Sequence, residues 1–128
     1  MLLLLDTHLV LWAAFAPERL SAAARKLIEP RQQPVAFSDA SLWEVAIKSS
    51  LGRPDFSVDA SLLRKRLLAA GFDELAIRAE HVLAAAALPW VHRDPFDRLL
   101  VAQAVVERWT LLTVDALLKP YGRHVRKV

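Results

Sequence analysis

Cysteine is absent from this chain of 128 residues. Its absence excludes thiol nucleophiles, zinc–thiolate sites, iron–sulfur clusters and a disulfide framework, and it fits a reducing compartment such as the cytoplasm. Any catalysis by this chain must therefore use carboxylates, histidines or hydroxyl groups.

Long apolar runs are also missing. No stretch reaches the roughly 20 uninterrupted apolar residues of a membrane-spanning helix, because charged residues, histidines or prolines recur throughout. The opening run Met1–Leu5 has no basic residue before it, is interrupted by Asp6 and is followed by no small-residue cleavage site, which argues against a secretory signal. We therefore expect a soluble, cytoplasmic protein in which this run forms a buried strand.

Repeats and low-complexity linkers are absent as well, so the three glycines and seven prolines serve to separate structural elements. Apolar residues make up 55% of the chain and charged residues 24%, which excludes a disordered or fibrous protein. A chain of 14.3 kDa is long enough to bury one core and too short for two. We expect a single domain over residues 1–128.

Basic residues outnumber acidic ones by 17 to 14, which gives a net charge of +3. Lys119, Arg123, Arg126 and Lys127 place four positive charges and no acid in the last ten residues, and Arg64-Lys65-Arg66 forms a second basic run. Such runs are either a solvated surface or a surface that binds a polyanion, and the sequence leaves both open.

Short apolar segments alternate with helical segments along the chain. The expected strands are 2–5, 34–37, 74–77 and 110–114, with a last extended piece near 124–128. The expected helices are 7–15, 21–29, 38 or 41 to 51, 57 or 59 to 70, 79–88 and 94–108, with a turn or short helix over 115–119. This alternation predicts an α/β fold, a three-layer α/β/α sandwich around a central parallel sheet of four to five strands.

Acidic side chains lie where the predicted strands end. Asp6 follows the first strand and Asp115 the fourth, Glu44 lies early in the helix after the second strand, and Asp94 and Asp97 begin the helix that leads into the fourth. Because parallel strands deliver their carboxyl ends to one edge, we expect these carboxylates to converge there. We also expect Trp43 and Ile47 to mark the buried stripe beside Glu44, and the apolar helix after Asp97 to be buried nearly all round.

Each of these acids also has a purely structural interpretation. Ser41 and Glu44 have the spacing of a capping box, and Asp94 followed by Pro95 is a typical helix start. Asp6 and Asp115 also stand where an N-cap would, and Glu44 has an exposed i,i+4 partner in Lys48. Capping alone does not explain why so many carboxylates gather at one edge of the sheet.

Carboxylates crowded together repel one another unless a positive charge neutralises them. A divalent cation is the simplest candidate, and without cysteine an oxygen-rich site suits Mg²⁺ or Mn²⁺. If Asp6, Glu44, Asp97 and Asp115 are set aside as ligands, 17 basic residues remain against 10 acidic ones, or +7. This surplus favours a nucleic acid as the partner.

Several stretches resemble the PIN-domain family in order and spacing, most closely the VapC-like ribonuclease toxins of bacterial type II toxin–antitoxin pairs. They are Leu5-Asp6-Thr7-His8 with Leu11-Trp12, Ser41-Leu42-Trp43-Glu44 with Lys48, His92-Arg93-Asp94-Pro95-Phe96-Asp97-Arg98-Leu99-Leu100 with Ala102-Gln103-Ala104, and Thr113-Val114-Asp115. The resemblance covers nearly the whole chain, and Asp94-Pro95-Phe96-Asp97-Arg98 is its most specific element.

The resemblance implies an α/β/α domain that uses Mg²⁺ or Mn²⁺ to cleave RNA, forms a homodimer and is inhibited by a small cognate antitoxin. The residues that match the family's acidic quartet, and would bind the metal and carry the catalysis, are Asp6, Glu44, Asp97 and Asp115. Asp94 matches an additional acid, either a metal ligand or only a cap. Thr7, Ser41 and Thr113 match hydroxyls that orient the acids, and His8 stands where many relatives have asparagine.

The expected reaction is metal-assisted hydrolysis of a phosphodiester, which leaves 5′-phosphate and 3′-hydroxyl ends. Arg93 and Arg98 flank the acids, where they either contact phosphate or, for Arg98, orient an acid. His8, His81, His92 and His124 are scattered, which is more typical of structural residues than of an acid–base pair.

Two other functions stay open. Asp6 at a strand end suits the nucleophile of a phosphatase or phosphotransfer domain, but His8 replaces the second Asp that the haloacid-dehalogenase pattern needs. A non-catalytic binding module would use its acids only as caps. Trp12 and Trp90 are expected in the core more often than stacked on RNA, and helices 20–29 and 62–70 either form a groove for an antitoxin or bury their apolar faces in the core.

Overall fold

The computed structural model describes residues 2–29, 33–52 and 56–128, and its centre is a five-stranded sheet of order β3-β2-β1-β4-β5. Every pair of neighbouring strands is parallel. The strands are β1 (Leu3–Leu5), β2 (Val35–Ser38), β3 (Asp73–Leu75), β4 (Thr110–Thr113) and β5 (Val125–Lys127). The sheet confirms the predicted parallel α/β class, and the last extended piece supplies its fifth strand.

Helices connect and cover these strands. They are α1 (Thr7–Phe15), η1 (Pro17–Arg19), α2 (Ala22–Ile28), α3 (Asp39–Ser50), α4 (Ala60–Ala69), α5 (Ala79–Ala87), α6 (Pro95–Glu107) and η2 (Ala116–Tyr121). Most start at a side chain that accepts a backbone N–H, including Ser21 for α2 and Asp59 for α4. Asp59, rather than Ser57, is thus the cap before α4.

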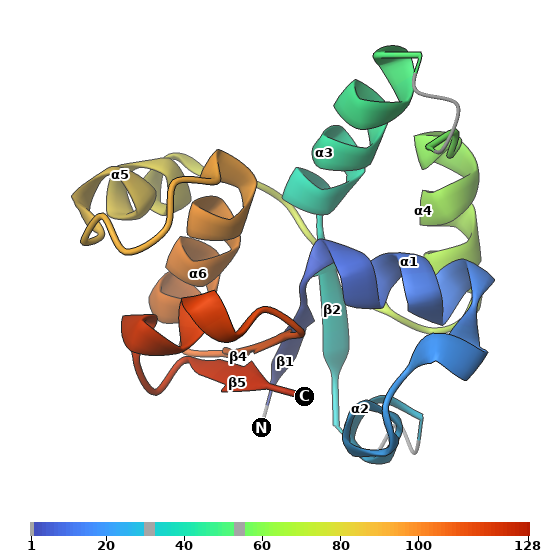
Figure 1. Cartoon of the computed structure of the whole chain (residues 1–128), viewed down its shortest axis with the longest axis horizontal. Helices are drawn as coiled ribbons and strands as arrows, with labels where there is room; N and C mark the ends of the chain where they lie inside the picture. The colour runs from blue at the N-terminus through green and yellow to red at the C-terminus, as the bar shows by residue number, and fades with distance from the viewer. Residues whose placement is uncertain (1, 30–32, 53–55) are drawn as a thin grey trace.

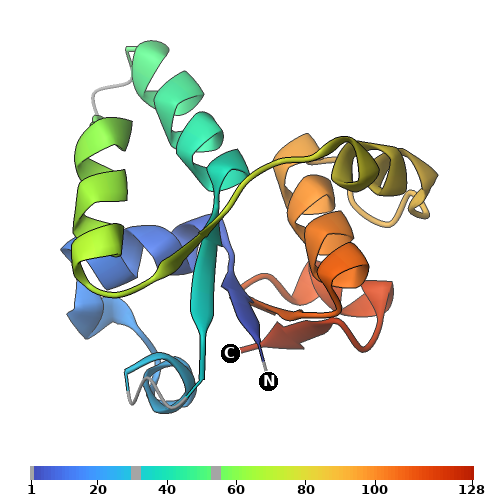
Figure 2. The same ribbon diagram turned by 180° about the vertical axis from the view of Figure 1, so that it is seen from behind.

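The sheet separates two layers of helices. Helices α1, α2 and α4 lie on one side of it, and α5 and α6 lie on the other (Figures 1 and 2). Leu3 and Leu5 of β1 pack into the first core cluster, whereas Leu4 packs into the second. This alternation explains why the strand is apolar at every position: both of its faces are covered.

The connection from β3 to β4 reverses the direction in which the sheet grows. The chain builds β1, β2 and β3 toward one edge, and then returns to add β4 and β5 on the other side of β1. The carboxyl ends of β1 and β4 therefore flank the switch point of the sheet, where open parallel sheets leave a crevice.

The predicted bounds of the third strand were wrong, whereas Ser38, one of the two starts predicted for the helix after β2, is its N-cap. The third strand is Asp73–Leu75 rather than 74–77, because Asp73 and Leu75 take the register opposite Ala36 and Ser38. Helix α3 begins at Asp39 with Ser38 as its N-cap, so Ser41 lies inside the helix and forms no capping box with Glu44.

The predicted burial also needs correction at the aromatic positions. Trp43 is 58% exposed and packs edge-on against Phe96, while the buried face of α3 is formed by Ala40, Ser41, Glu44 and Val45. Trp90 was expected in the core but is 77% exposed. Helix α6 is buried along most of its length, although Val105 faces solvent.

The described residues contain no helix that combines the length and apolar character needed to cross a bilayer.

Candidate active site

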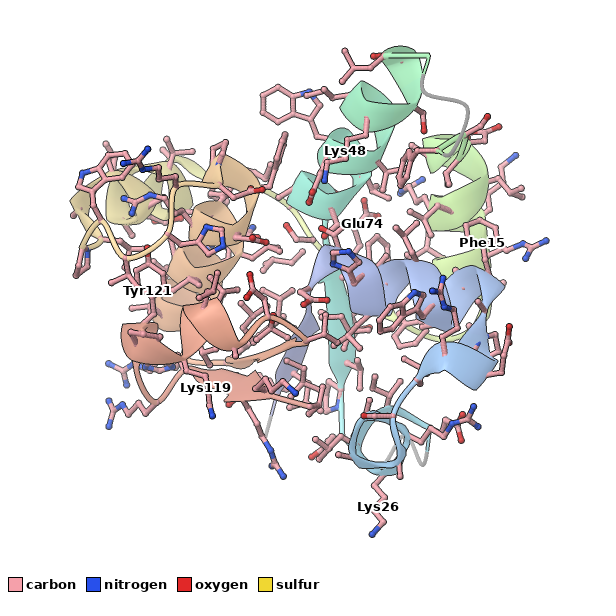
Figure 3. All side chains as sticks on the ribbon, in the orientation of Figure 1. Phe15, Lys26, Lys48, Glu74, Lys119 and Tyr121 are labelled. Atoms are coloured by element: carbon pink, nitrogen blue, oxygen red, sulfur yellow. The ribbon has the colours of Figure 1, made fainter. Side chains whose placement is uncertain are left out.

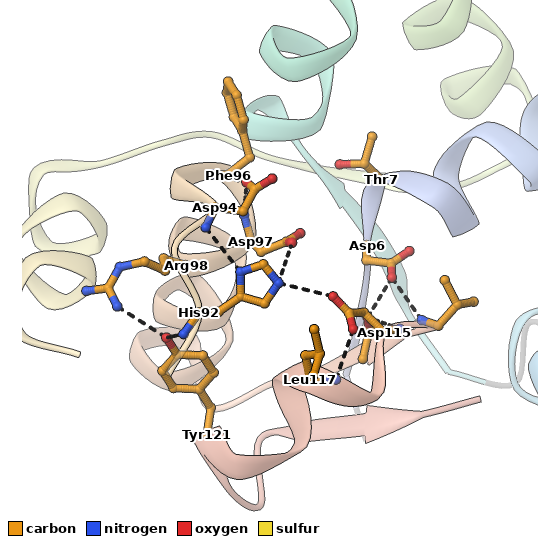
Figure 4. Close-up of polar contacts among 12 residues, drawn as sticks. Asp6, Thr7, His92, Asp94, Phe96, Asp97, Arg98, Asp115, Leu117 and Tyr121 are labelled. Atoms are coloured by element: carbon orange, nitrogen blue, oxygen red, sulfur yellow. Dashed lines mark hydrogen bonds and ion pairs between the residues drawn. The ribbon is translucent and has the colours of Figure 1, made fainter. Parts of the chain in front are cut away.

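The acids predicted to converge do surround the switch point. Asp6 ends β1, Asp115 follows β4, Glu44 lies on α3 after β2, and Asp97 lies in the first turn of α6. In the close-up of this edge, Asp97 and Asp115 point toward His92, with Asp6 beside them (Figure 4). The sheet topology thus brings together residues that are more than 100 positions apart in the sequence.

Asp6 is the most constrained of the acids, with a relative exposure of 3%. Its Oδ1 accepts the N–H of Leu9 at 2.9 Å and so caps α1. Its Oδ2 accepts the hydroxyl of Thr113 at 2.7 Å and the N–H of Val114 at 3.0 Å. Burial raises the pKa of Asp6, and these hydrogen bonds partly offset that rise.

Each oxygen of the Glu44 carboxylate accepts a hydrogen bond from a different side chain. Thr7 donates its hydroxyl to Oε1 at 2.6 Å, and Lys48 donates to Oε2 at 2.5 Å. The Thr7 hydroxyl also lies 3.0 Å from that of Ser41. Lys48 projects from α3 (Figure 3). Thr7 thus contacts Glu44 directly and Ser41 contacts Thr7, while Lys48 gives Glu44 a half-buried positive neighbour.

Asp94 and Asp97 differ in what they contact. Asp94 caps α6, because its Oδ1 accepts the N–H groups of Phe96 at 2.8 Å and Asp97 at 3.1 Å. Burial is the largest cause that raises the pKa of Asp97, to about 7, followed by the negative charges of Asp94 and Glu44. Asp97 therefore holds a proton more readily than an ordinary carboxyl group when no cation is bound.

Asp115 lies closest to a histidine that the sequence did not single out. Its Oδ1 caps η2 by accepting the N–H of Leu117, and its Oδ2 lies 3.1 Å from Nε2 of His92. The same Nε2 lies 3.6 Å from Oδ2 of Asp97. His92, Asp97 and Asp115 offer three ligand atoms that all lie within 4.8 Å of one another.

His92 was grouped with the scattered histidines because its distance from Asp115 in the sequence hides their contact. Its place inside the stretch His92–Arg98, which carries the resemblance, was the available signal. His81, by contrast, is fully buried and contacts Glu107, away from this edge.

The two flanking arginines do not contact the acids. Arg93 is exposed on the loop before α6. Arg98 is buried and directs its guanidinium to the carbonyl oxygens of Ala85, Leu88 and Pro89, with its flat face 4.1 Å from the Trp90 ring. The described residues thus show Arg98 paired with carbonyl oxygens of the loop that carries His92 and with no acid, and its contact with phosphate stays a prediction.

The donor set at this edge fits a hard divalent cation. Four carboxylates from four elements lie at this edge of the sheet, and within the described residues only Lys48 and His92 pair with them as basic side chains. Mg²⁺ and Mn²⁺ favour oxygen ligands of this kind, and after burial the negative charges of Asp94 and Glu44 contribute to the raised pKa of Asp97.

A cavity of about 700 Å³ opens beside the acids. Thr7 and Glu44 form its wall nearest the site, and it continues between α1, α3 and the start of α4. Its apolar and aromatic lining includes Trp12, Phe15, Phe56 and Leu62. The predicted groove between helices 20–29 and 62–70 therefore has a counterpart that uses the second of these helices, with α1 and α3 as its other walls.

Comparison with known proteins agrees with this arrangement. The model of the PIN domain family matches residues 3–123. Ribonuclease VapC22 from Mycobacterium tuberculosis (strain ATCC 25618 / H37Rv) is 33% identical over 126 residues, which are 98% of this chain and 95% of that protein.

Two solved structures share the fold. The crystal structure of VapBC2 from Rickettsia felis, bound to a DNA fragment from its promoter, aligns with a TM-score of 0.71 at 15% identity, over 100% of this chain and 99% of that one. A toxin–antitoxin complex from Klebsiella pneumoniae aligns with a TM-score of 0.62 at 18% identity, over 96% and 94%. With its parallel sheet, its acids at the switch point and the family match along nearly its full length, the chain belongs to the PIN-domain family.

Proposed function

We propose that this protein is the toxin of a type II toxin–antitoxin pair and acts as a divalent-metal-dependent endoribonuclease. The observation that carries the proposal is the convergence of Asp6, Glu44, Asp97 and Asp115 at the switch point, in a chain 33% identical to a named ribonuclease. The substrate is RNA, and the products carry 5′-phosphate and 3′-hydroxyl ends.

The four carboxylates are the residues that would hold the metal, Mg²⁺ or Mn²⁺. When bound, such a cation activates water for attack and neutralises the charge that develops on the phosphate in the transition state. Asp94 is assigned the role of a cap, because its Oδ1 already accepts two N–H groups of α6. The resemblance left this role open, and the geometry favours the cap.

The neighbours of the carboxylates prepare them for this task. The hydroxyls of Thr7 and Thr113 fix the oxygens of Glu44 and Asp6, so these groups need no reorientation when the site is loaded. Burial of Asp6 and Glu44 excludes bulk water from the floor of the site, which strengthens the electrostatic interactions there. Lys48 lies at the rim, where it can contact a phosphate of the RNA as well as Glu44.

The decisive experiment is cleavage of end-labelled RNAs by the purified protein with Mg²⁺, Mn²⁺ or EDTA, followed by analysis of the product ends. Asp97→Asn should abolish cleavage while keeping the fold, and Asp73→Asn is the matched control, because Asp73 is an exposed acid on β3. Products with 2′,3′-cyclic phosphate, or cleavage that survives EDTA, would overturn the metal-dependent mechanism.

Other outcomes select the other functions. Hydrolysis of phosphomonoesters without cleavage of RNA would favour the phosphatase alternative. A folded protein that neither binds Mn²⁺ nor cleaves RNA would reduce the acids to helix caps, a role that Asp6, Asp94 and Asp115 do fill.

The proposed partner is a cognate antitoxin that inhibits the nuclease. The cavity between α1, α3 and α4 shares Thr7 and Glu44 with the acidic edge, so a segment seated in it blocks access to the metal ligands. Leu62→Asp changes the lining of the cavity without touching the acids. It should weaken inhibition by the antitoxin while RNA cleavage by the free toxin persists, and unchanged inhibition would place the antitoxin elsewhere.

A further inference from the structure

His92 lies between two of the proposed metal ligands, and its ring is held from both sides. The backbone N–H of Asp94 donates to Nδ1 at 3.1 Å, and Nε2 lies 3.1 Å from Oδ2 of Asp115 and 3.6 Å from Oδ2 of Asp97 (Figure 4). The ring is also mostly shielded from solvent, with 17% of the side chain exposed.

These contacts determine which ring nitrogen carries the proton. A nitrogen that accepts an N–H has no hydrogen of its own, so Nδ1 is the acceptor. The neutral ring of His92 must therefore carry its hydrogen on Nε2, which donates it to Asp115. Because that N–H occupies the in-plane position of Nε2, no lone pair points from it toward the acids.

The loop that carries His92 is itself held in place. The N–H of His92 donates to the hydroxyl of Tyr121 at 3.1 Å, and that hydroxyl donates to the carbonyl of Pro89 at 3.0 Å. Arg98 adds hydrogen bonds to the carbonyls of Leu88 and Pro89. Rotation of the ring to offer Nδ1 to a cation would break the bond from Asp94 inside this supported loop.

From this geometry we infer that His92 is a positioning residue, which donates Nε2–H to Asp115 and keeps it beside Asp97, and that it is not a metal ligand. Asp115 needs such support because its side chain is 36% exposed. The N–H of Leu117 holds Oδ1, and His92 holds Oδ2. Asp97 and Asp115 come from α6 and the end of β4, so the imidazole links two elements whose acids repel each other. The inference deepens the proposed function and rests on it.

Two substitutions of His92 distinguish the roles of its two ring nitrogens. The amide nitrogen of His92→Gln reaches the place of Nε2 and can still donate to Asp115. The amide of His92→Asn reaches only the place of Nδ1. Groups that orient metal ligands contribute about 10–100-fold to affinity, so His92→Asn should bind Mn²⁺ weaker by that factor, while His92→Gln stays within about threefold of wild type.

The probe is Mn²⁺ added to the full chain, followed by titration calorimetry at pH 7.5. His124→Asn is the matched control, since Nδ1 of its ring lies 3.0 Å from the carbonyl oxygen of Trp109, which precedes β4 at the end of the sheet opposite the acids. Thermal unfolding of each variant distinguishes lost positioning from lost structure, and His92→Gln keeps the test valid if His92→Asn is unstable.

Two spectroscopic measurements address the ring directly. Nitrogen NMR should find the neutral ring protonated at Nε2, both in the free protein and with saturating Mg²⁺. Pulsed EPR of bound Mn²⁺ should show no nitrogen directly bonded to the metal. Nitrogen coupling from His92, or equal Mn²⁺ affinity in His92→Asn and wild type, would overturn the inference.

RNA cleavage measured on the same samples distinguishes a failure of this inference from a failure of the proposed nuclease function. If wild type binds Mn²⁺ and cleaves RNA, but His92→Asn does both equally well, the inference fails and the nuclease stands. If wild type neither binds Mn²⁺ nor cleaves RNA, the proposed nuclease fails and the inference falls with it.

Discussion

The hydroxyl of Thr113 donates a 2.7 Å hydrogen bond to the carboxylate of Asp6, 107 residues earlier in the chain. The same hydroxyl accepts the N–H of Asp115 at 3.0 Å. One buried threonine thus ties the end of β1 to the turn after β4, and it sets the positions of two of the four acids.

Replacing this hydroxyl with a methyl group tests its role. Thr113→Val should lower the free energy of unfolding by about 1–3 kcal/mol, because it leaves the N–H of Asp115 and an oxygen of Asp6 short of a partner in a buried place. It should also lower RNA cleavage. Thr113→Ser keeps the hydroxyl and should retain most of both properties, and Thr110→Val on the same strand is the control. Full activity in Thr113→Val would show that Asp6 needs no orientation.

The raised pKa of Asp97 makes stability depend on pH. Asp97 has its ordinary value of 3.8 in the unfolded chain and about 7 in the folded protein without metal. The folded state therefore holds the proton more tightly, so the contribution of this group to stability is full below pH 4 and is lost as the pH rises toward 7. Asp97→Asn should remove this decline and raise the metal-free Tm at pH 7.5.

The size of this effect is limited by solvent screening at the crevice. We expect Asp97→Asn to be more stable than wild type by about 1–2 kcal/mol at pH 7.5 without metal, and about equal to it at pH 4. Thermal unfolding in EDTA at the two pH values measures the difference, with Asp73→Asn as the control. A lower Tm for Asp97→Asn at pH 7.5 would contradict the raised pKa of Asp97 in the folded protein.

Metal should reverse that order of stability. A ligand at 100 times its Kd stabilises the folded state by about 2.7 kcal/mol, so saturating Mn²⁺ should raise the Tm of wild type. Asp97→Asn lacks one of the four ligands and should gain much less. Asp97→Asn should therefore have the higher Tm in EDTA and wild type the higher Tm in saturating Mn²⁺. An equal rise in Tm in both proteins would indicate that the ion binds elsewhere.

Arg98 should matter for stability and not for RNA affinity. Arg98→Met removes the guanidinium that donates to the half-buried carbonyls of Ala85 and Leu88, although Ala85 still accepts the N–H of Leu88, so the free energy of unfolding should fall by about 1–3 kcal/mol. The salt dependence of RNA binding should stay unchanged in protein that is still folded. A normal Tm for Arg98→Met, together with a salt dependence of RNA binding whose slope is smaller by about one, would instead indicate that Arg98 contacts a phosphate, as the sequence suggested.

The predicted homodimer has candidate contacts on α5 and the loop after it. Val82, Leu83, Trp90 and Val91 are large apolar residues that are 43–77% exposed, and such groups gather where another surface covers them. Leu83→Asp should shift the protein from dimer to monomer in sedimentation velocity. Leu51→Asp, at the equally exposed end of α3, should leave the dimer intact.

Much of the fold was predictable because its signals are local. The run Leu2–Leu5 and the pair Asp94-Pro95 each specify an element through burial or capping, and the order of strands and helices then implies the parallel sheet. The acids could be placed at one edge by topology alone. The strand over 73–75 was less predictable, because its register depends on pairing with β2 rather than on its own apolar pattern.

The failures concern side chains whose partners are distant in the sequence. Trp43 and Trp90 are large aromatic residues but lie on the surface, where Trp43 packs edge-on against Phe96 and Arg98 lies over the ring of Trp90. Arg98 follows Asp97 in the sequence, but successive residues of a helix point in different directions. The side chain of Arg98 therefore points toward the loop after α5 instead of toward the acids. His92 gained its role only from the fold, which brings the end of β4 within reach of its ring.

Asp6, Asp94 and Asp115 each begin a helix with the same carboxyl group that faces the acidic edge. Asparagine caps helices about as well as aspartate, but at Asp6 both oxygens already accept donors, so an NH₂ group there would face either the N–H of Leu9 or the Thr113 hydroxyl and the Val114 N–H. An inactive form of this protein that folds with little penalty therefore lies one substitution away at Asp97, where asparagine removes a charge that folding disfavours. A cell that carries such a gene can disarm it by a single mutation and still make a folded chain for the partner to bind.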